Sequence, residues 1–230
     1  KFLKANADAV RSDNHDSLNA AVAAYVRDNP DRYASGTLLA NYYYIPGHEA
    51  QALELVESVS DKVSRCASLR GISDLARRLA VPVDSVRIES FTIADRKGQV
   101  LTVDPHTSAR SLLMFTDAGS RASDSVVGML RSVSASSTPK VNIVDISADP
   151  DTAAWLASLR EIAKTDSLGR FPGVKRGWTA APFAIMGLDD IAVAGMPWFV
   201  VTDSTMRVLY RGPSAKSAGS IALTGKKRRR

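Results

Sequence analysis

Cysteine is almost absent from this sequence of 230 residues, which contains a single one, Cys66. A lone cysteine cannot form a disulfide within the chain or join other cysteines around a metal ion. The residues from Val63 to Leu69 have a helical pattern, so we expect a packed or partly exposed thiol there rather than a nucleophile. The sequence therefore excludes chemistry that needs a pair of thiols in one chain.

Long apolar runs and familiar catalytic motifs are also missing. No run of about 18 apolar residues occurs, so no segment is expected to span a membrane. The histidines His15, His48 and His106 are scattered, without the His-x-x-x-His or paired-carboxylate spacing of a metal site. The sequence has no Gly-x-Ser-x-Gly elbow and no glycine-rich phosphate or dinucleotide motif. We therefore expect neither a metal ion nor a cofactor.

Positive charge is concentrated at the C-terminus. The net charge is +6, and five basic residues occur together in the run from Lys226 to Arg230. The remaining 25 lysines and arginines nearly balance 24 acidic residues, so the folded part has no basic stripe and no nucleic-acid partner is expected. Residues 225–230 are predicted to form a disordered basic tail, with binding to nucleic acid or anionic lipid as the alternative.

Residues 1–83 predict a small α-helical domain. Apolar residues recur at helical spacing in segments that end at Pro30, at Pro46 and before Pro82. We expect Asp16 and Ser17 to cap the first helix, Ser35 or Thr37 to begin the second, and two more helices to cover 48–60 and 64–79. Short helices joined by short turns pack as antiparallel neighbours.

Residues 84–224 predict a second domain in which strands alternate with helices. The pattern indicates an α/β fold, with a mixed sheet flanked by helices. Asp149 is predicted to cap a helix, and residues 165–182, rich in glycine and proline, are predicted to be irregular. The expected strands lie at 87–93, 99–103, 111–115, 140–146, 198–202 and 207–210, and the expected helices at 123–133, 149–159, 183–188 and 214–223.

Five motifs in this second domain resemble, in the same order, those of the thioredoxin superfamily. The sequence is similar to the periplasmic thiol–disulfide oxidoreductases of Bacteroidetes, which carry a helical segment before the thioredoxin domain. The resemblance covers residues 87–223 and implies a thioredoxin-like fold with a cis peptide bond before Pro197. The matching segments are Phe91-Thr-Ile-Ala-Asp-Arg-Lys-Gly-Gln-Val100, Leu112-Leu-Met-Phe115, Ile146-Ser-Ala-Asp-Pro-Asp-Thr-Ala-Ala-Trp155, Gly195-Met-Pro-Trp-Phe-Val-Val-Thr-Asp203 and Arg207-Val-Leu-Tyr-Arg-Gly212.

The resemblance fails at the position that carries the chemistry. It implies a Cys-x-x-Cys loop after Phe115, but the matching residues are Ser120 and Ser123. The aromatic residues that usually flank the first cysteine are missing as well. A serine hydroxyl has no accessible redox couple, whereas the family depends on a thiolate that exchanges disulfides. Loss of the whole loop signature favours natural degeneration over an engineered replacement.

Two kinds of function remain open on this sequence. One is a redox-inactive binding or structural module, which holds an extended peptide or a protein partner in a groove formed by Gly119, Arg121, Met196, Pro197 and Trp198. Such binding uses main-chain hydrogen bonds and needs no cysteine. The alternative is a thiol–disulfide oxidoreductase that works through a non-standard site or has been disarmed by cysteine replacement.

The two loop serines allow two interpretations. Ser120 and Ser123 can bind an anion or a peptide carbonyl at the start of a helix. In the simpler interpretation, Ser123 is an N-cap and Ser120 a loop residue. The resemblance also implies a periplasmic or outer-membrane lipoprotein location, with membrane association only through a lipid anchor outside this chain.

Overall fold

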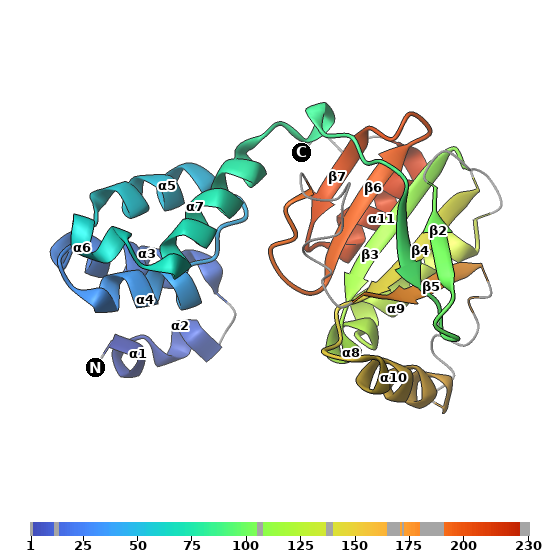
Figure 1. Cartoon of the computed structure of the whole chain (residues 1–230), viewed down its shortest axis with the longest axis horizontal. Coiled ribbons are helices and arrows are strands. Elements are labelled where there is room, and N and C mark those ends of the chain that lie inside the picture. Colours follow the sequence, from blue (N-terminus) through green and yellow to red (C-terminus); the bar gives the residue numbers. More distant parts are fainter. Residues whose placement is uncertain are drawn as a thin grey trace. The chain divides into compact units, whose positions relative to one another are not determined.

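The computed structural model of the chain describes residues 2–11, 14–104, 108–136, 140–164, 171, 173–179 and 191–225 (Figure 1). Its contacts divide the chain into two compact units, Lys1–Val81 and Pro82–Arg230, and each unit has its own apolar core. We call them the helical unit and the sheet unit. His106, the predicted helix 183–188 and the basic run 226–230 lie outside the described residues. Within the described residues, no helix is long and apolar enough to cross a membrane.

The helical unit packs amphipathic helices around a core that includes the fully buried Val22, Leu39 and Leu55. Every segment predicted to be helical contains helix, but some boundaries were predicted wrongly. The helices are α1 (Phe2–Ala5), α2 (Ala7–Arg11), α3 (His15–Asp28), α4 (Tyr33–Tyr42), α5 (Glu49–Ser58), α6 (Asp61–Ser64) and α7 (Ala67–Ala80).

Two helix starts differ from the prediction, and a side-chain cap accounts for the first of them. The cap of α3 is Asn14, whose side chain accepts a hydrogen bond from the Ser17 N–H, rather than Asp16 or Ser17. The helix α4 begins at Tyr33, and Ser35 lies inside it with its hydroxyl donating to the Asn29 carbonyl oxygen. The predicted helix 64–79 corresponds to α7, which begins at Ala67, and its predicted first residue, Ser64, instead ends α6.

The sheet unit confirms the predicted α/β class. Most predicted strands and helices of the described residues are present within a few positions of their expected bounds. Its elements are the 3-10 turn η1 (Val83–Ser85), the strands β1 (Phe91–Ala94), β2 (Val100–Val103), β3 (Arg110–Thr116), β4 (Val141–Ser147), β5 (Val174–Trp178), β6 (Trp198–Asp203) and β7 (Val208–Gly212), and the helices α8 (Ala118–Arg121), α9 (Asp124–Ser134), α10 (Thr152–Lys164) and α11 (Ala215–Thr224).

The seven strands form one mixed sheet in the order β2-β1-β5-β4-β3-β6-β7. The central β3 pairs in parallel with β4 and antiparallel with β6, and both predicted hairpins, β1–β2 and β6–β7, are antiparallel. The helices α9 and α11 lie side by side against one face of the sheet, where they cover Leu112 and Met114 of β3 (Figure 1). Alternate residues of one strand point to opposite faces, so β3 is buried on both sides.

Two expectations about this unit are wrong. The strand β5 lies within the segment predicted to be irregular, and it pairs in parallel with β4. Its sequence, Val-Lys-Arg-Gly-Trp, has too few apolar residues and no alternation, so local pattern alone did not indicate a strand. Asp149 is not the cap of α10, because the Asp151 carboxylate accepts the Ala154 N–H instead.

Candidate functional site

The candidate site lies where β3 ends and the chain turns into α9. Asp117 follows β3 and caps the single turn α8, and Ser123 stands at the N-cap position of α9. Ser123 therefore occupies the helix start that the sequence predicted. Ser120 lies within α8, in a short helical turn rather than in an open loop.

The hydroxyls of both serines are engaged within this turn. The Ser120 hydroxyl accepts the Asp117 N–H at 3.0 Å, and the Asp117 carboxylate accepts the Ser120 N–H at 2.8 Å, so the two residues form a capping box. The same hydroxyl also donates to the Asp117 carboxylate at 2.6 Å. The Ser123 hydroxyl donates to the Ser120 carbonyl oxygen at 2.8 Å and makes no N-cap hydrogen bond. Neither hydroxyl is arranged as the nucleophile of a Ser–His pair.

The charge of Asp117 is stabilised by the same contacts. Burial raises the pKa of the Asp117 carboxyl, but hydrogen bonds from the Ser120 hydroxyl and backbone N–H lower it, with the Arg121 charge adding to the effect. The net result is a pKa below the ordinary value. A negative charge therefore stands beside the position at which the resemblance implies the first cysteine.

The cis peptide bond lies between Met196 and Pro197, directly before β6. Strand register pairs Phe115 of β3 with Trp198 of β6, so the chain that enters β6 runs beside the chain that leaves β3. Gly119 is exposed, and Met196 and Pro197 are half-buried. The fold thus brings these three predicted groove residues to the same end of the sheet.

Two other predicted groove residues do not lie on a surface. Trp198 is 2% exposed and packs in the core, with an Nε1 that has no hydrogen-bond partner among the described residues. Arg121 is 0% exposed. The prediction that they line a groove is wrong. The Trp198 side chain is buried in the core of the sheet unit, and the Arg121 side chain is hydrogen-bonded to buried polar groups.

Arg121 is held by acceptors at the carboxyl ends of β3 and β4. Its Nε donates to the Thr116 hydroxyl at 3.1 Å and to the Asp145 carboxylate at 3.2 Å. Its Nη1 donates to the Asp149 carboxylate at 3.1 Å and to the Ser158 hydroxyl at 2.6 Å. Because guanidinium is planar and presents donors in several directions, one side chain can tie β3, β4 and α10 together.

The Asp149 carboxylate joins this cluster to the start of α8. One of its oxygens accepts the Ala118 N–H at 2.9 Å, and the other accepts the Ser147 hydroxyl at 2.8 Å. The two neighbouring helices α8 and α10 are visible at the same end of the sheet in Figure 1. We call Thr116, Arg121, Asp145, Asp149 and Ser158 the Arg121 cluster.

The two carboxylates of the Arg121 cluster are balanced by two cations, Arg121 itself and the neighbouring Arg176. Asp145 and Asp149 are both buried, and Arg176 adds a second cation whose Nε lies 3.8 Å from the Asp145 carboxylate. Burial lowers the pKa of Arg176, and the nearby Asp145 opposes that effect. An unpaired buried charge lowers the stability of the fold by several kcal/mol, so loss of any one of these charged groups should destabilise the protein.

Sequence reasoning identified Arg121 but missed its partners. The available signal was Asp145, which interrupts the otherwise apolar stretch Ile143–Ile146 of a predicted buried strand. A carboxylate in that position requires a cation or several hydrogen bonds. Which cation supplies them depends on the chain path after β3, and no local pattern specifies that path.

A protein with this sheet order, this cis-proline position and this helix start has a thioredoxin-like α/β fold. The solved structures that resemble it include a thioredoxin-like protein from Bacteroides caccae, with a TM-score of 0.52 and 12% identity over 92% of this chain and 78% of that one. At this identity the likeness concerns the fold, which confirms the predicted class. No protein-family profile matches the sequence, and no curated protein matches it.

Structures with lower scores carry similar descriptions. A thiol–disulfide oxidoreductase from Bacteroides fragilis matches with a TM-score of 0.44 and 17% identity, over 60% of this chain and 95% of that one. The thioredoxin domain of a thiol–disulfide oxidoreductase from Bacteroides vulgatus matches with a TM-score of 0.46 and 14% identity, over 61% of this chain and 95% of that one.

In the described part of this chain, no group of three or more His, Cys, Asp or Glu residues is placed to hold a metal ion.

Proposed function

We propose that this protein is a redox-inactive thioredoxin-like module that binds a partner and does not exchange disulfides. One observation carries the proposal: Ser120 and Ser123 occupy the helix-start positions where the resemblance implies cysteines, and both hydroxyls are committed to hydrogen bonds within the turn. The one cysteine, Cys66, belongs to the helical unit. Oxygen at these positions cannot carry electrons between substrates.

The proposed partner is an extended peptide segment, free or part of a protein, at the Met196–Pro197 edge. Support comes from the exposed Gly119 and Gly195 and the half-buried Met196 and Pro197, which come together at one end of the sheet. Extended peptides bind such edges through main-chain hydrogen bonds, so this binding survives the loss of cysteine. The Arg121 cluster supports this role by fixing the turn that carries Gly119.

Insulin reduction by dithiothreitol tests the redox half of the proposal. The full chain should not accelerate insulin precipitation above the rate with dithiothreitol alone, while a thioredoxin control should. Turnover that disappears in Cys66→Ser would reject the proposal in favour of an oxidoreductase with a non-standard site.

A double substitution, Ser120→Cys with Ser123→Cys, tests whether the chain is a disarmed enzyme. We expect weak insulin reduction, because the Asp117 carboxylate beside position 120 disfavours a thiolate. Adding Asp117→Asn, which keeps an N-cap residue but removes the charge, should raise the rate. Activity equal to that of a thioredoxin in the double variant alone would favour the disarmed oxidoreductase.

Fluorescence polarisation with a library of extended peptides tests the binding half. Peptides that bind the full chain should bind Met196→Lys at least about tenfold more weakly, which corresponds to about 1.4 kcal/mol. The control is Val100→Lys, a substitution at a residue that is 78% exposed on the edge strand β2. Equal affinity for both variants, or loss only in Val100→Lys, would place binding elsewhere.

We also propose that the protein works in the periplasm, either free or as an outer-membrane lipoprotein. The support is the sequence resemblance to periplasmic oxidoreductases together with the shared fold. Cell fractionation and palmitate labelling of the native, full-length protein test this location. Recovery of unlabelled protein in the cytosolic fraction would contradict it.

A further inference from the structure

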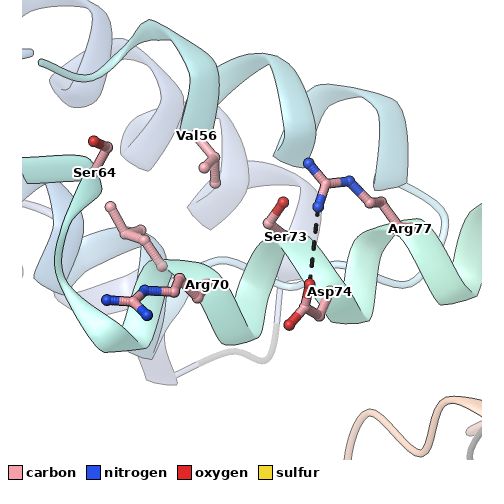
Figure 2. A pocket seen from close by; sticks show the side chains of 7 residues that line it. Val56, Ser64, Arg70, Ser73, Asp74 and Arg77 are labelled. Carbon is pink, nitrogen blue, oxygen red and sulfur yellow. Dashed lines mark ion pairs between the residues drawn. The ribbon is translucent and has the colours of Figure 1, made fainter. Parts of the chain in front are cut away.

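A cavity in the helical unit is not used by the proposed function. It has a volume of about 330 Å³ and lies between α5, α6 and α7 (Figure 2). Val56 of α5 and Leu69 of α7 form the apolar part of its wall, and the other lining residues are all polar or charged. The polar groups belong mainly to one face of α7.

Two arginines flank this cavity. Arg70 and Arg77 are seven residues apart on α7, which separates their Cα atoms by about 10 Å along the helix axis. Figure 2 shows them on either side of Ser73. Side chains of this length can reach the same group above Ser73, and guanidinium matches the geometry of phosphate oxygens.

The hydrogen-bond donors that line this cavity make few strong contacts with other protein groups. Arg77 has one ion pair, with Asp74 at 3.8 Å, and both side chains are 65% exposed. That distance is too long for a hydrogen bond, and an exposed pair of this kind contributes little to stability. Among the described residues, Arg70 makes no ion pair and the largely buried Ser73 makes no side-chain hydrogen bond.

The charge of the surrounding segment favours an anion. From Lys62 to Ala80 the chain has five basic residues and one acidic residue, Asp74. The helical unit as a whole has no such excess, because most of its acidic residues precede Lys62. A local excess of positive charge around a cavity attracts small anions and raises their local concentration.

We propose that this cavity binds a phosphate group, either as free phosphate or as part of a small phosphate ester. Arg70 and Arg77 hold its oxygens from two sides, and the Ser73 hydroxyl donates a hydrogen bond from the floor. When phosphate binds, Arg77 exchanges its ion pair with Asp74 for an ion pair with the phosphate. The site belongs to the helical unit and is independent of the proposed peptide binding by the sheet unit.

Nuclear magnetic resonance titration of the full chain tests this site. Inorganic phosphate and glycerol phosphate are added separately at constant ionic strength, which distinguishes the free anion from the ester. The Nε–H signals of Arg70 and Arg77 and the amide of Ser73 should shift and saturate. Arg70→Ala and Arg77→Ala should each weaken binding by at least about tenfold.

The matched control is Arg78→Ala, which removes the same charge from the same helix at a position outside the cavity lining. This variant should bind phosphate as the unchanged chain does. Equal weakening by all three variants would show general attraction to α7 and overturn the site. Absence of saturable shifts, or binding of succinate as tight as that of both phosphates, would overturn the assignment to phosphate.

Discussion

At the scale of single residues, Arg121 links the turn between β3 and α9 to buried carboxylates of the sheet unit. In the family that this sequence resembles, the matching position lies between two cysteines. In this protein the Arg121 side chain is buried and forms ion pairs with Asp145 and Asp149. Each of these three groups would be an uncompensated buried charge without the others. The turn is therefore fixed by electrostatics and hydrogen bonds rather than by its own apolar packing.

Arg121→Met should reduce the free energy of unfolding by about 3–5 kcal/mol, because it leaves two buried carboxylates without their main cation. Urea unfolding followed by tryptophan fluorescence measures the change. The control is Arg207→Met, which breaks an ion pair between partly exposed side chains, Arg207 and Asp203, and should cost less than about 1 kcal/mol. If Arg121→Met does not fold, Arg121→Lys should fold with a smaller loss of unfolding free energy. Equal losses in Arg121→Met and Arg207→Met would contradict the stabilising role of the Arg121 cluster.

Ser120→Ala should destabilise the protein in a pH-dependent way. The folded-state pKa of Asp117 is lowered, so its contribution is present above the ordinary pKa of about 4 and lost as the pH falls through the folded-state value. Removing the Ser120 hydroxyl should cost about 0.5–1 kcal/mol at pH 7 and less below about pH 4.

Urea unfolding at pH 7 and at pH 3 measures this difference. Ser132→Ala is the control, because the Ser132 hydroxyl bonds the Gly128 carbonyl oxygen of α9 and involves no carboxylate. Its effect should not depend on pH. A Ser120→Ala deficit that is the same at both pH values would show that the Asp117 charge is not involved.

At the scale of elements, β5 depends on a close approach to β1. The one ladder pair between them joins Ala94 to Trp178, next to Gly177. A Cβ on Gly177 would overlap the Ile93 side chain and lie 3.1 Å from the Ala94 carbonyl oxygen. Glycine therefore lets the two strands come together, and a side chain there would separate them.

Gly177→Ala should lower the free energy of unfolding by about 1–3 kcal/mol through this overpacking. Gly128→Ala is a control of opposite sign, because Gly128 lies exposed within α9 and a Cβ there meets nothing within 4 Å. Alanine should stabilise that helix by about 0.5–1 kcal/mol. Thermal unfolding of both variants provides the measurement, and a stabilised Gly177→Ala would contradict the proposed overlap.

At the scale of the whole molecule, each unit has its own core, so we expect each to unfold cooperatively on its own. The chain provides a separate probe for each. Trp155, Trp178 and Trp198 all belong to the sheet unit, whereas Cys66 belongs to the helical unit. Tryptophan fluorescence and thiol labelling therefore report different units of the same chain.

Urea unfolding of the full chain should give separate transitions for tryptophan fluorescence and for Cys66 labelling. Gly177→Ala should move the fluorescence midpoint and leave the labelling midpoint in place. Coincident transitions that both move in this variant would show that the two units unfold as one.

The structure differs from the prediction where contacts between distant parts of the chain determine the local conformation. The hairpins β1–β2 and β6–β7 follow from short alternating segments and turns, and their strands were placed correctly within a few residues. The strand β5 was missed, because its neighbours β4 and β1 supply its hydrogen bonds and its own residues do not show a strand pattern. Local signals cannot report partners that are distant in the chain.

The sequence by itself determined the fold class, most of the helical and sheet segments, and the presence of Ser120 and Ser123 at the start of the helix after β3. These features depend on apolar periodicity and on residue types at short spacing, which a linear sequence displays. Only the tertiary structure shows that Arg121 and Trp198 are buried, and that Asp149 forms an ion pair with Arg121 instead of capping α10. Charged side chains are stable in a core only when distant segments supply their partners, and folding is what brings those segments together.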